Sequence, residues 1–393
     1  MTTTSTSPVG MSLRDRLVTV RRDLHRIPEL AFHERETRAY LERELGRFAT
    51  VVPVGGTGLY VDLGPASASR TLLLRADMDG LPVMEATGRP WASQHPGKMH
   101  ACGHDGHMAA LLVAAELLSQ APPDDLRLRV LFQPAEEGGG GAQSCIDDGA
   151  LDGVDGAFGI HLWNELPVGT VALTPGGIMA GVVEFTIRVR GRGGHGAMPH
   201  RTADPVVAAA QLVVALQSIA SRFTSPVEPV VVTVGSIHAG SAFNVIPEEC
   251  VLNGTVRTFS FSEQEAVEGH LRAIANGIGA ATDTKMEVTW TVYTSPTVND
   301  ETYAELAGKS LERMTGVRRV LTDYRTMAGE DFGEILRVVP GCFALVGSGN
   351  PDLGLAEPHH SPRFDFDEEA LVIACDLHRA VASELADSGP LDG

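Results

Sequence analysis

Residues 126–138 read Leu-Arg-Leu-Arg-Val-Leu-Phe-Gln-Pro-Ala-Glu-Glu-Gly, an apolar-rich run that ends in two adjacent glutamates. Its first seven residues predict a β-strand that leads into Glu136 and Glu137. Because neighbouring residues point to opposite sides of a strand, the pair must lie where the strand breaks into the glycines at 138–141. The stretch therefore predicts a buried strand whose carboxyl end delivers two carboxylates.

The rest of the first half of the chain alternates between helix and strand. Residues 11–26 and 106–118 carry apolar residues at helical spacing, whereas 70–77 and 154–161 are short apolar runs typical of buried strands. This alternation predicts an α/β fold, with a mainly parallel sheet and helices on both of its faces. Ligands gather at the carboxyl ends of such strands, and these strands end in acids or in a histidine.

A second group of predicted elements occupies residues 181–294. It contains strands at 182–190, 229–237, 250–259 and 286–293 and helices at 203–222 and 262–280, the last with Ser262 as its expected N-cap. The order β-α-β-β-α-β predicts a ferredoxin-like unit, whose sheet has an edge able to pair with a second copy. After residue 295 the earlier alternation returns, so this unit is inserted into the larger one.

Length and composition agree with two soluble domains. A chain of 393 residues exceeds the size at which one core keeps growing, and it is 43% hydrophobic and 21% charged. We expect a discontinuous domain of residues 11–180 and 295–390 that carries the site. We also expect an inserted lid or dimerisation domain at 181–294 and a disordered tail at 1–10.

Charge and cysteine content restrict the partners and the compartment. The net charge of −19 disfavours nucleic acid and anionic membranes as partners. Five scattered cysteines form no disulfide framework, which favours a reducing cytoplasm. The polar N-terminus lacks the apolar segment of a signal peptide, and we expect no membrane-spanning stretch.

The run His100-Ala-Cys-Gly-His-Asp-Gly-His107 provides a second set of candidate ligands. Sulfur, imidazole and carboxylate donors on neighbouring strand ends suit a divalent transition metal. A second glutamate beside a ligand glutamate suits a general base that acts on a metal-bound water. A different hypothesis makes Cys102 a nucleophile with His104 or His107 as its base. It leaves the glutamate pair unexplained.

Seven motifs stand in an order that resembles a known family: 75–82 (RADMDGLP), 100–107 (HACGHDGH), 133–138 (QPAEEG), 159–163 (GIHLW), 191–199 (GRGGHGAMP), 244–247 (NVIP) and 360–365 (HSPRFD). Together they resemble the dinuclear metallo-amidohydrolases of the aminoacylase/carboxypeptidase G superfamily. The cysteine-containing block is similar to the branch of hippurate hydrolases, N-acyl-amino-acid amidohydrolases and plant auxin-conjugate hydrolases. The resemblance covers about residues 12–386.

The resemblance implies roles for individual residues. The ligands of two divalent ions, Zn²⁺ or Mn²⁺ with Co²⁺ or Ni²⁺ as alternatives, fall on Cys102, His104, Glu137, His161 and His360. Glu136 matches the general base, and Asp79 matches an acid that orients a ligand. His195 matches a residue that reaches the partner subunit's site and stabilises the oxyanion. Asn244 and Arg257 resemble groups that hold the substrate's carboxylate.

The same resemblance implies hydrolysis of the amide bond of a small N-acyl amino acid by a homodimer or a dimer-based oligomer. A dipeptidase or carboxypeptidase is the alternative within the same chemistry, and an inactive metal- and ligand-binding relative is a further one. Of the remaining histidines, we expect a structural role near the site for His25, and hydrogen bonding to ligands for His100 and His107. In the tandem His359-His360, His360 matches the motif.

Overall fold

The computed structural model describes residues 11–388, so the expected tail at 1–10 lies outside the described residues. The chain divides into two compact units. The second unit comprises Met179–Thr297 together with Thr326–Gly333, and the first unit contains the remaining described residues. We expected residues 326–333 in the large domain, and their position in the second unit corrects that boundary. The segment has little regular structure, so its pattern gave no indication of this.

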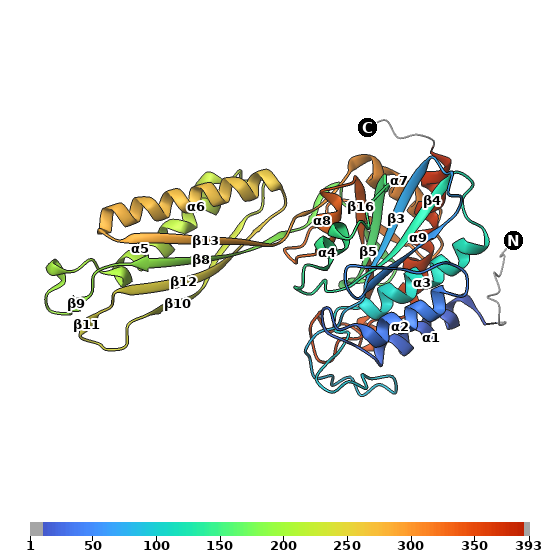
Figure 1. Cartoon of the computed structure of the whole chain (residues 1–393), viewed down its shortest axis with the longest axis horizontal. Helices are drawn as coiled ribbons and strands as arrows, with labels where there is room; N and C mark the ends of the chain where they lie inside the picture. Colours follow the sequence, from blue (N-terminus) through green and yellow to red (C-terminus); the bar gives the residue numbers. More distant parts are fainter. Residues whose placement is uncertain (1–10, 389–393) are drawn as a thin grey trace. The chain divides into compact units, whose positions relative to one another are not determined.

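The first unit is built on one eight-stranded sheet (Figure 1). Its strands are β1 (Val52–Val54), β2 (Gly58–Leu63), β3 (Arg70–Asp77), β4 (Leu126–Gln133), β5 (Gly156–Pro167), β6 (Thr170–Ala172), β15 (Arg319–Leu321) and β16 (Gly341–Gly349). They lie in the order β1-β2-β4-β3-β5-β16-β6-β15. The central strands β4, β3, β5 and β16 are parallel, whereas β1, β2 and β6 pair antiparallel with their neighbours β2, β4 and β16. The sheet is therefore mixed, and the prediction of a mainly parallel sheet is correct only for its central strands.

A glycine turn explains one of the antiparallel edges. β1 and β2 form a hairpin in which Val54 pairs with Gly58. Between them, Gly55 and Gly56 have φ angles of 58° and 81°, which residues with a side chain rarely adopt. The chain therefore turns back on itself here without the crossover that a parallel pair requires.

Helices cover the first unit's sheet. They are α1 (Leu13–His25), α2 (Arg35–Leu45), α3 (His104–Gln120), α4 (Gly141–Asp147), α7 (Glu301–Arg313) and α9 (Glu369–Asp387). All of these except α4 contribute to one apolar core with alternate strand residues such as Leu72 and Leu74. Leu73, between these two residues, points to the opposite face and is also buried. The same holds for Phe343 of β16, whose neighbours Cys342 and Ala344 belong to the core. Both faces of the central strands are therefore shielded from water, as strands in a parallel arrangement require.

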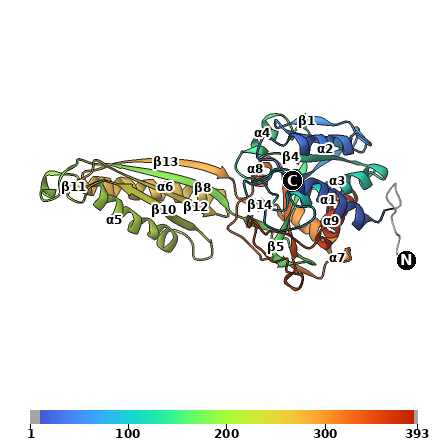
Figure 2. The same cartoon turned by 90° about the horizontal axis from the view of Figure 1, so that it is seen from below.

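The second unit has a four-stranded antiparallel sheet with two helices (Figures 1 and 2). Its elements are β8 (Gly181–Arg190), α5 (Pro205–Ser218), β10 (Val231–Ala239), β12 (Glu249–Thr258), α6 (Phe261–Thr282) and β13 (Lys285–Thr294). The strand order is β10-β12-β8-β13. Alternate residues of β8, such as Phe185 and Ile187, are buried against the helices. The short strands β9 (Gly194–His195) and β11 (Val245–Ile246) pair with each other outside this sheet. The boundaries between the two units fall within β7 (Gly176–Met179), β14 (Thr297–Asn299) and α8 (Phe332–Leu336).

One expectation for the helices of the second unit is wrong. Helix α6 begins at Phe261, one residue before its expected start, and its N-cap is Ser260 instead of Ser262, because the hydroxyl of Ser260 accepts the backbone N–H of Glu263. One helical segment, Pro205–Phe223, is long and apolar enough to cross a membrane by length and composition. Its residues Leu212 and Leu216 are buried in the unit's own core.

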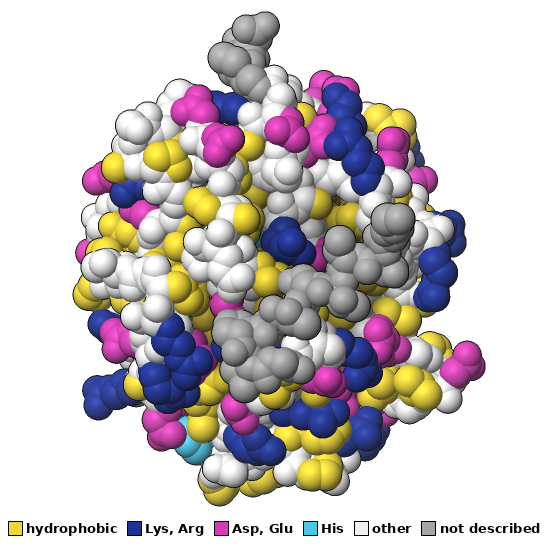
Figure 3. Space-filling model, turned by 90° about the vertical axis from the view of Figure 1, so that its right-hand side faces the viewer, with side chains coloured by type: hydrophobic (Ala, Val, Ile, Leu, Met, Phe, Trp, Pro, Cys, Tyr) yellow, Lys and Arg dark blue, Asp and Glu magenta, His cyan; other side chains and the backbone are white. Residues whose placement is uncertain are grey.

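Surface charge is mixed on at least one side of the molecule. Figure 3 shows acidic and basic side chains interspersed on the face that it presents. The whole chain carries a formal charge of −19. A continuous basic surface, which nucleic-acid binding needs, is therefore not a feature of that face.

A buried ionic cluster connects the segments that will carry the candidate site. The guanidinium of Arg21 in α1 donates to Asp105 (2.7 Å), Asp365 (2.8 Å) and Glu368 (3.3 Å). His25 lies 2.8 Å from the same oxygen of Asp105. Asp105 follows the first residue of α3, and Asp365 and Glu368 precede α9. One cation therefore fixes the starts of two helices relative to α1.

We predict that Arg21→Ala lowers the free energy of unfolding by about 3–5 kcal/mol, because it leaves buried carboxylates without their counter-charge. The matched control is Arg14→Ala on the same helix. Arg14 pairs with Glu369, and about half of each side chain is exposed, so its loss costs about 0–1 kcal/mol. Urea unfolding measures both values. Equal losses in the two variants would contradict this description of the cluster.

Candidate metal centre

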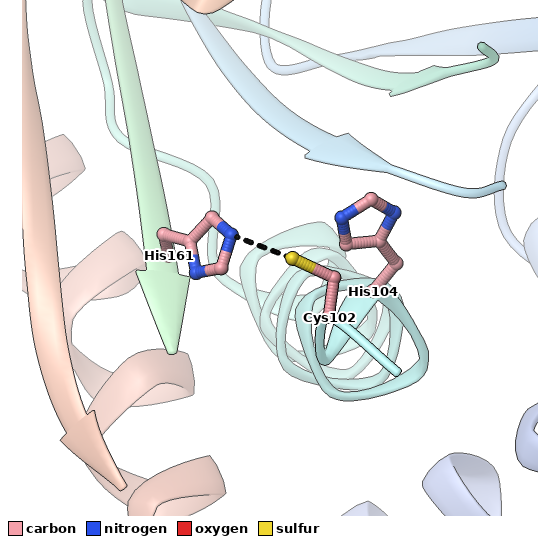
Figure 4. Close-up of side chains that lie close together, drawn as sticks. All are labelled: Cys102, His104 and His161. Atoms are coloured by element: carbon pink, nitrogen blue, oxygen red, sulfur yellow. Dashed lines mark hydrogen bonds between the residues drawn. The ribbon is translucent and has the colours of Figure 1, made fainter. Parts of the chain in front are cut away.

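The histidine- and cysteine-rich motif forms the start of α3. Cys102 lies two residues before the helix and His104 is its first residue. Between them, Gly103 has a φ of 95°, a conformation that lets the chain turn directly into the helix. His161 comes from β5, and Figure 4 shows its ring facing the sulfur of Cys102. The three side chains are buried.

The glutamate pair lies just beyond the end of β4. The strand ends at Gln133, and Ala135 adopts a left-handed φ of 53°, so the pair no longer follows the alternation of the strand. The backbone N–H groups of Glu136 and Glu137 donate to the two carboxylate oxygens of Asp79, and the N···O distance is 3.1 Å in both hydrogen bonds. Asp79 therefore fixes the backbone from which both carboxylates project.

The expected ligands of the first unit come together in one cluster. The Sγ of Cys102 is 3.5 Å from the Nε2 of His161. The Oε1 of Glu137 is 3.9 Å from the Nε2 of His104 and 3.3 Å from the Nε2 of His360. Several groups of three residues have donor atoms within 4.8 Å of one another, and those that contain only the expected ligands and Glu136 are Cys102–His104–His161, Cys102–Glu137–His360 and His104–Glu136–Glu137. These groups overlap, so neighbouring ions could share donors.

Hydrogen bonds determine which imidazole nitrogens are available. The Nδ1–H of His104 donates to the backbone oxygen of Asp79 (3.0 Å), and that of His161 donates to the backbone oxygen of Leu162 (2.7 Å). Each neutral ring then presents an unprotonated Nε2. Within residues 11–388 the buried Nε2 of His104 has no hydrogen-bond partner. A buried nitrogen without a partner is costly, and coordination of a metal would satisfy it.

His107 is held differently. Its Nδ1 donates to Asp77 (2.7 Å), and its Nε2 accepts the backbone N–H of Leu162 (2.8 Å). Both ring nitrogens are occupied, so His107 supports the strand end that carries His161. Asp77 also accepts a hydrogen bond from the buried Arg75 (2.8 Å). The sequence marked Asp77 as an acid at a strand end, but its support of His107 was missed.

The tandem histidines make different contacts. His360 has a left-handed φ of 65°, which is uncommon for a residue with a side chain and is often found at functional sites. Its half-exposed ring faces Glu137. His359 stacks on Trp163 instead, with ring centroids 4.6 Å apart. The backbone of His360 is fixed by an N–H···O bond to Ala101 (2.8 Å).

The protein groups of the cluster carry an excess of negative charge. Burial alone would lower the pKa of His104, but Asp77 and Asp79 raise it to about 10. Burial and the neighbouring Glu137 raise the pKa of the Cys102 thiol. A divalent cation would replace these protons, since metal binding deprotonates its ligands. Charge, donor types and the free Nε2 of His104 all fit a transition-metal ion.

The other expected site residues belong to the second unit. His195 pairs with Val245 between β9 and β11, which places Asn244 beside it. The Nδ1 of His195 accepts the N–H of Ala197 (3.0 Å), so its neutral ring carries a proton on Nε2. Arg257 lies on β12, where burial lowers its pKa and no counter-charge among the described residues offsets this effect.

We predict that a divalent metal stabilises the protein through Cys102. Zn²⁺ at a hundred times its Kd should stabilise the metal-free protein by about 2.7 kcal/mol. Cys102→Ala should remove most of this gain. Cys375→Ala is the matched control, because Cys375 is a buried cysteine of α9. Unfolding measured with and without Zn²⁺ checks the prediction, and an equal gain in both variants would contradict it.

Comparison with known proteins gives the family. The model of peptidase family M20/M25/M40 matches residues 73–384. An N-acetyl-L-cysteine deacetylase of Bacillus subtilis is 41% identical over 388 residues, with 97% of this chain and 91% of that protein covered. The IAA-amino acid hydrolase ILR1-like 4 of Arabidopsis thaliana is 37% identical over 380 residues, with 94% and 85% covered.

A solved structure agrees with this result. A dinuclear metal-binding peptidase of the M20 family from Bacillus subtilis superimposes with a TM-score of 0.85 and 34% sequence identity. The match covers 95% of this chain and 99% of that one. The family predicted from the seven motifs is confirmed: this chain belongs to peptidase family M20/M25/M40.

Proposed function

We propose that the protein is a metal-dependent amidohydrolase that cleaves N-acyl amino acids into a carboxylic acid and a free amino acid. The observation that carries the proposal is the convergence of His104 and His161 on Cys102, with the glutamate pair grouped around the same His104. Two divalent ions, Zn²⁺ or Mn²⁺, would be held by Cys102, His104, Glu137, His161 and His360, with Co²⁺ or Ni²⁺ as alternatives. Relatives named as deacetylases and as an amino-acid conjugate hydrolase support this chemistry.

The glutamates divide the work in this proposal. When bound, the ions would lower the pKa of a water and polarise the amide carbonyl. Glu136 takes a proton from the attacking water and returns it to the leaving nitrogen. Glu137, which lies 3.3 Å from His360, acts as a ligand. Asp79 accepts the backbone N–H groups of both glutamates. It thereby holds each carboxylate in the position that its own role requires.

The structure argues against Cys102 as a nucleophile. A nucleophilic cysteine needs a lowered pKa, whereas burial and Glu137 raise that of Cys102. His107, one of the bases considered, has both ring nitrogens occupied by Asp77 and Leu162. A ligand role requires neither a free base nor an exposed thiol.

We further propose that the second unit is the ferredoxin-like lid and dimerisation domain. Its element order β8-α5-β10-β12-α6-β13 and its antiparallel sheet support this assignment. Arg257 pairs with Val182 at the start of β8, whereas His195 follows the end of β8. Val182 and Arg190, near the two ends of β8, are about 26 Å apart at ~3.3 Å per residue. One small substrate could not meet both residues of one chain, which supports an active site shared between two subunits.

In this arrangement Asn244 and His195 come from one subunit and Arg257 comes from the other. The guanidinium of Arg257 suits the carboxylate of an amino acid, and the Nε2–H of His195 suits the carbonyl oxygen as it gains negative charge. A cytoplasmic location is part of the proposal, and the five free cysteines support it.

We predict that Glu136→Gln keeps its bound metal but loses at least about 100-fold in kcat, because the proton acceptor is gone. Glu137→Gln should lose bound metal instead. The measurements are metal content and the release of free amine from a series of N-acetyl amino acids. Equal metal content in the two variants would contradict the division of roles, and release of amine from dipeptides alone would favour the peptidase alternative.

The shared site predicts complementation between two inactive variants. His195→Ala and Glu136→Gln are each expected to be nearly inactive. After subunit exchange, one of the two sites of a mixed dimer holds both native residues, and part of the activity returns. The control mixes Glu136→Gln with Glu137→Gln, whose defects fall in the same half-site. No recovery in demonstrated heterodimers would contradict the shared site.

A further inference from the structure

His359 has no part in the chemistry proposed above, yet its ring is held in a fixed plane. It lies against Trp163 and Phe364, with ring centroids 4.6 and 4.9 Å away and interplanar angles of 29° and 35°. The edge of His161 faces it at 5.3 Å. These contacts prevent the ring from turning, so the direction of each ring nitrogen is set by its neighbours.

A backbone hydrogen bond fixes the tautomer of His359. The N–H of Asn164 donates to its Nε2 over 3.2 Å. Asn164 is itself held in place, because the hydroxyl of Ser348 donates to its side-chain oxygen (2.7 Å) and its amide nitrogen donates to the backbone oxygen of Asp365 (2.9 Å). Since Nε2 is an acceptor, the proton of the neutral ring lies on Nδ1.

That Nδ1 lies 3.8 Å from the sulfur of Cys102. We propose that His359 is a positioning residue that donates an N–H···S hydrogen bond to the Cys102 thiolate and so tunes the bond between sulfur and metal. The inference rests on the metal centre proposed above. It concerns a side chain outside the five proposed ligands.

The direction of the effect follows from charge. The thiolate of Cys102 would be buried and close to the carboxylates of Glu136 and Glu137, an environment that disfavours a further negative charge. A hydrogen bond to the sulfur stabilises that charge and withdraws electron density from it. His161 cannot provide this bond, because its Nδ1 is used by Leu162 and its Nε2 presents a lone pair. His359 supplies the donor.

Two substitutions separate the hydrogen bond from the stacking. His359→Phe keeps a ring against Trp163 but has no N–H. His359→Asn loses the ring but can place an amide N–H close to the position of Nδ1. Both variants lose the Nε2 atom that accepts the Asn164 N–H, and the comparison between them concerns the donor and the ring. The readouts are the Co²⁺ affinity of the metal-free proteins and the thiolate-to-cobalt charge-transfer band.

For His359→Phe we expect the charge-transfer band to move to lower energy and the Co²⁺ affinity to fall by about 10–100-fold, as for other partners of metal ligands. His359→Asn should remain near the native band. The opposite order, with Phe near native and Asn shifted, would show that the ring contacts matter and would overturn the inference. Identical bands in all three proteins would also overturn it.

The native protein separates this inference from the proposed function. If native protein bound no Co²⁺ or showed no thiolate-to-cobalt band, the assignment of Cys102 as a ligand would be wrong, whatever the variants did. If the native band is present but neither variant moves it, the metal centre stands and the role of His359 is wrong.

Discussion

The candidate site depends on Asp79, which follows β3 and touches both motifs that supply ligands. Its carboxylate accepts the backbone N–H groups of Glu136 and Glu137, and its backbone oxygen accepts the Nδ1–H of His104. A single residue thus sets the position of the glutamate pair relative to α3. It also sets the tautomer of His104, so that Nε2 faces the cluster.

The same arrangement explains why the site needs a cation. Asp77, Asp79 and the glutamate pair bring several carboxylates close to buried imidazoles, and the pKa of His104 rises to about 10 in response. Burying such groups without a counter-ion is unfavourable. In the buried ionic cluster, Arg21 neutralises Asp105 and Asp365 and holds the starts of α3 and α9. The guanidinium of Arg21 therefore neutralises the carboxylates around the site, and metal ions would neutralise the carboxylates at its centre.

Much of this could be predicted from the sequence, for identifiable reasons. Strands β3 and β4 have strong apolar runs, and their limits agree closely with the expected ones. Helix α2 was missed because its first N–H groups are capped by Glu29, several residues upstream, rather than by an N-cap side chain. The antiparallel edges depend on turns such as Gly55-Gly56, and the support roles of Asp77 and His359 depend on contacts between distant segments. Periodicity carries no information on such contacts.

Hydrolysis by this protein is proposed to depend on two ions held by residues of the first unit. The most direct measurement is a titration of metal-free protein with Zn²⁺ or Mn²⁺, in which the rate of amine release from an N-acetyl amino acid is followed against the equivalents added. We expect negligible turnover without metal and a rate that stops rising at about two equivalents per chain, the stoichiometry of a two-ion site. Full turnover by metal-free protein would contradict this expectation.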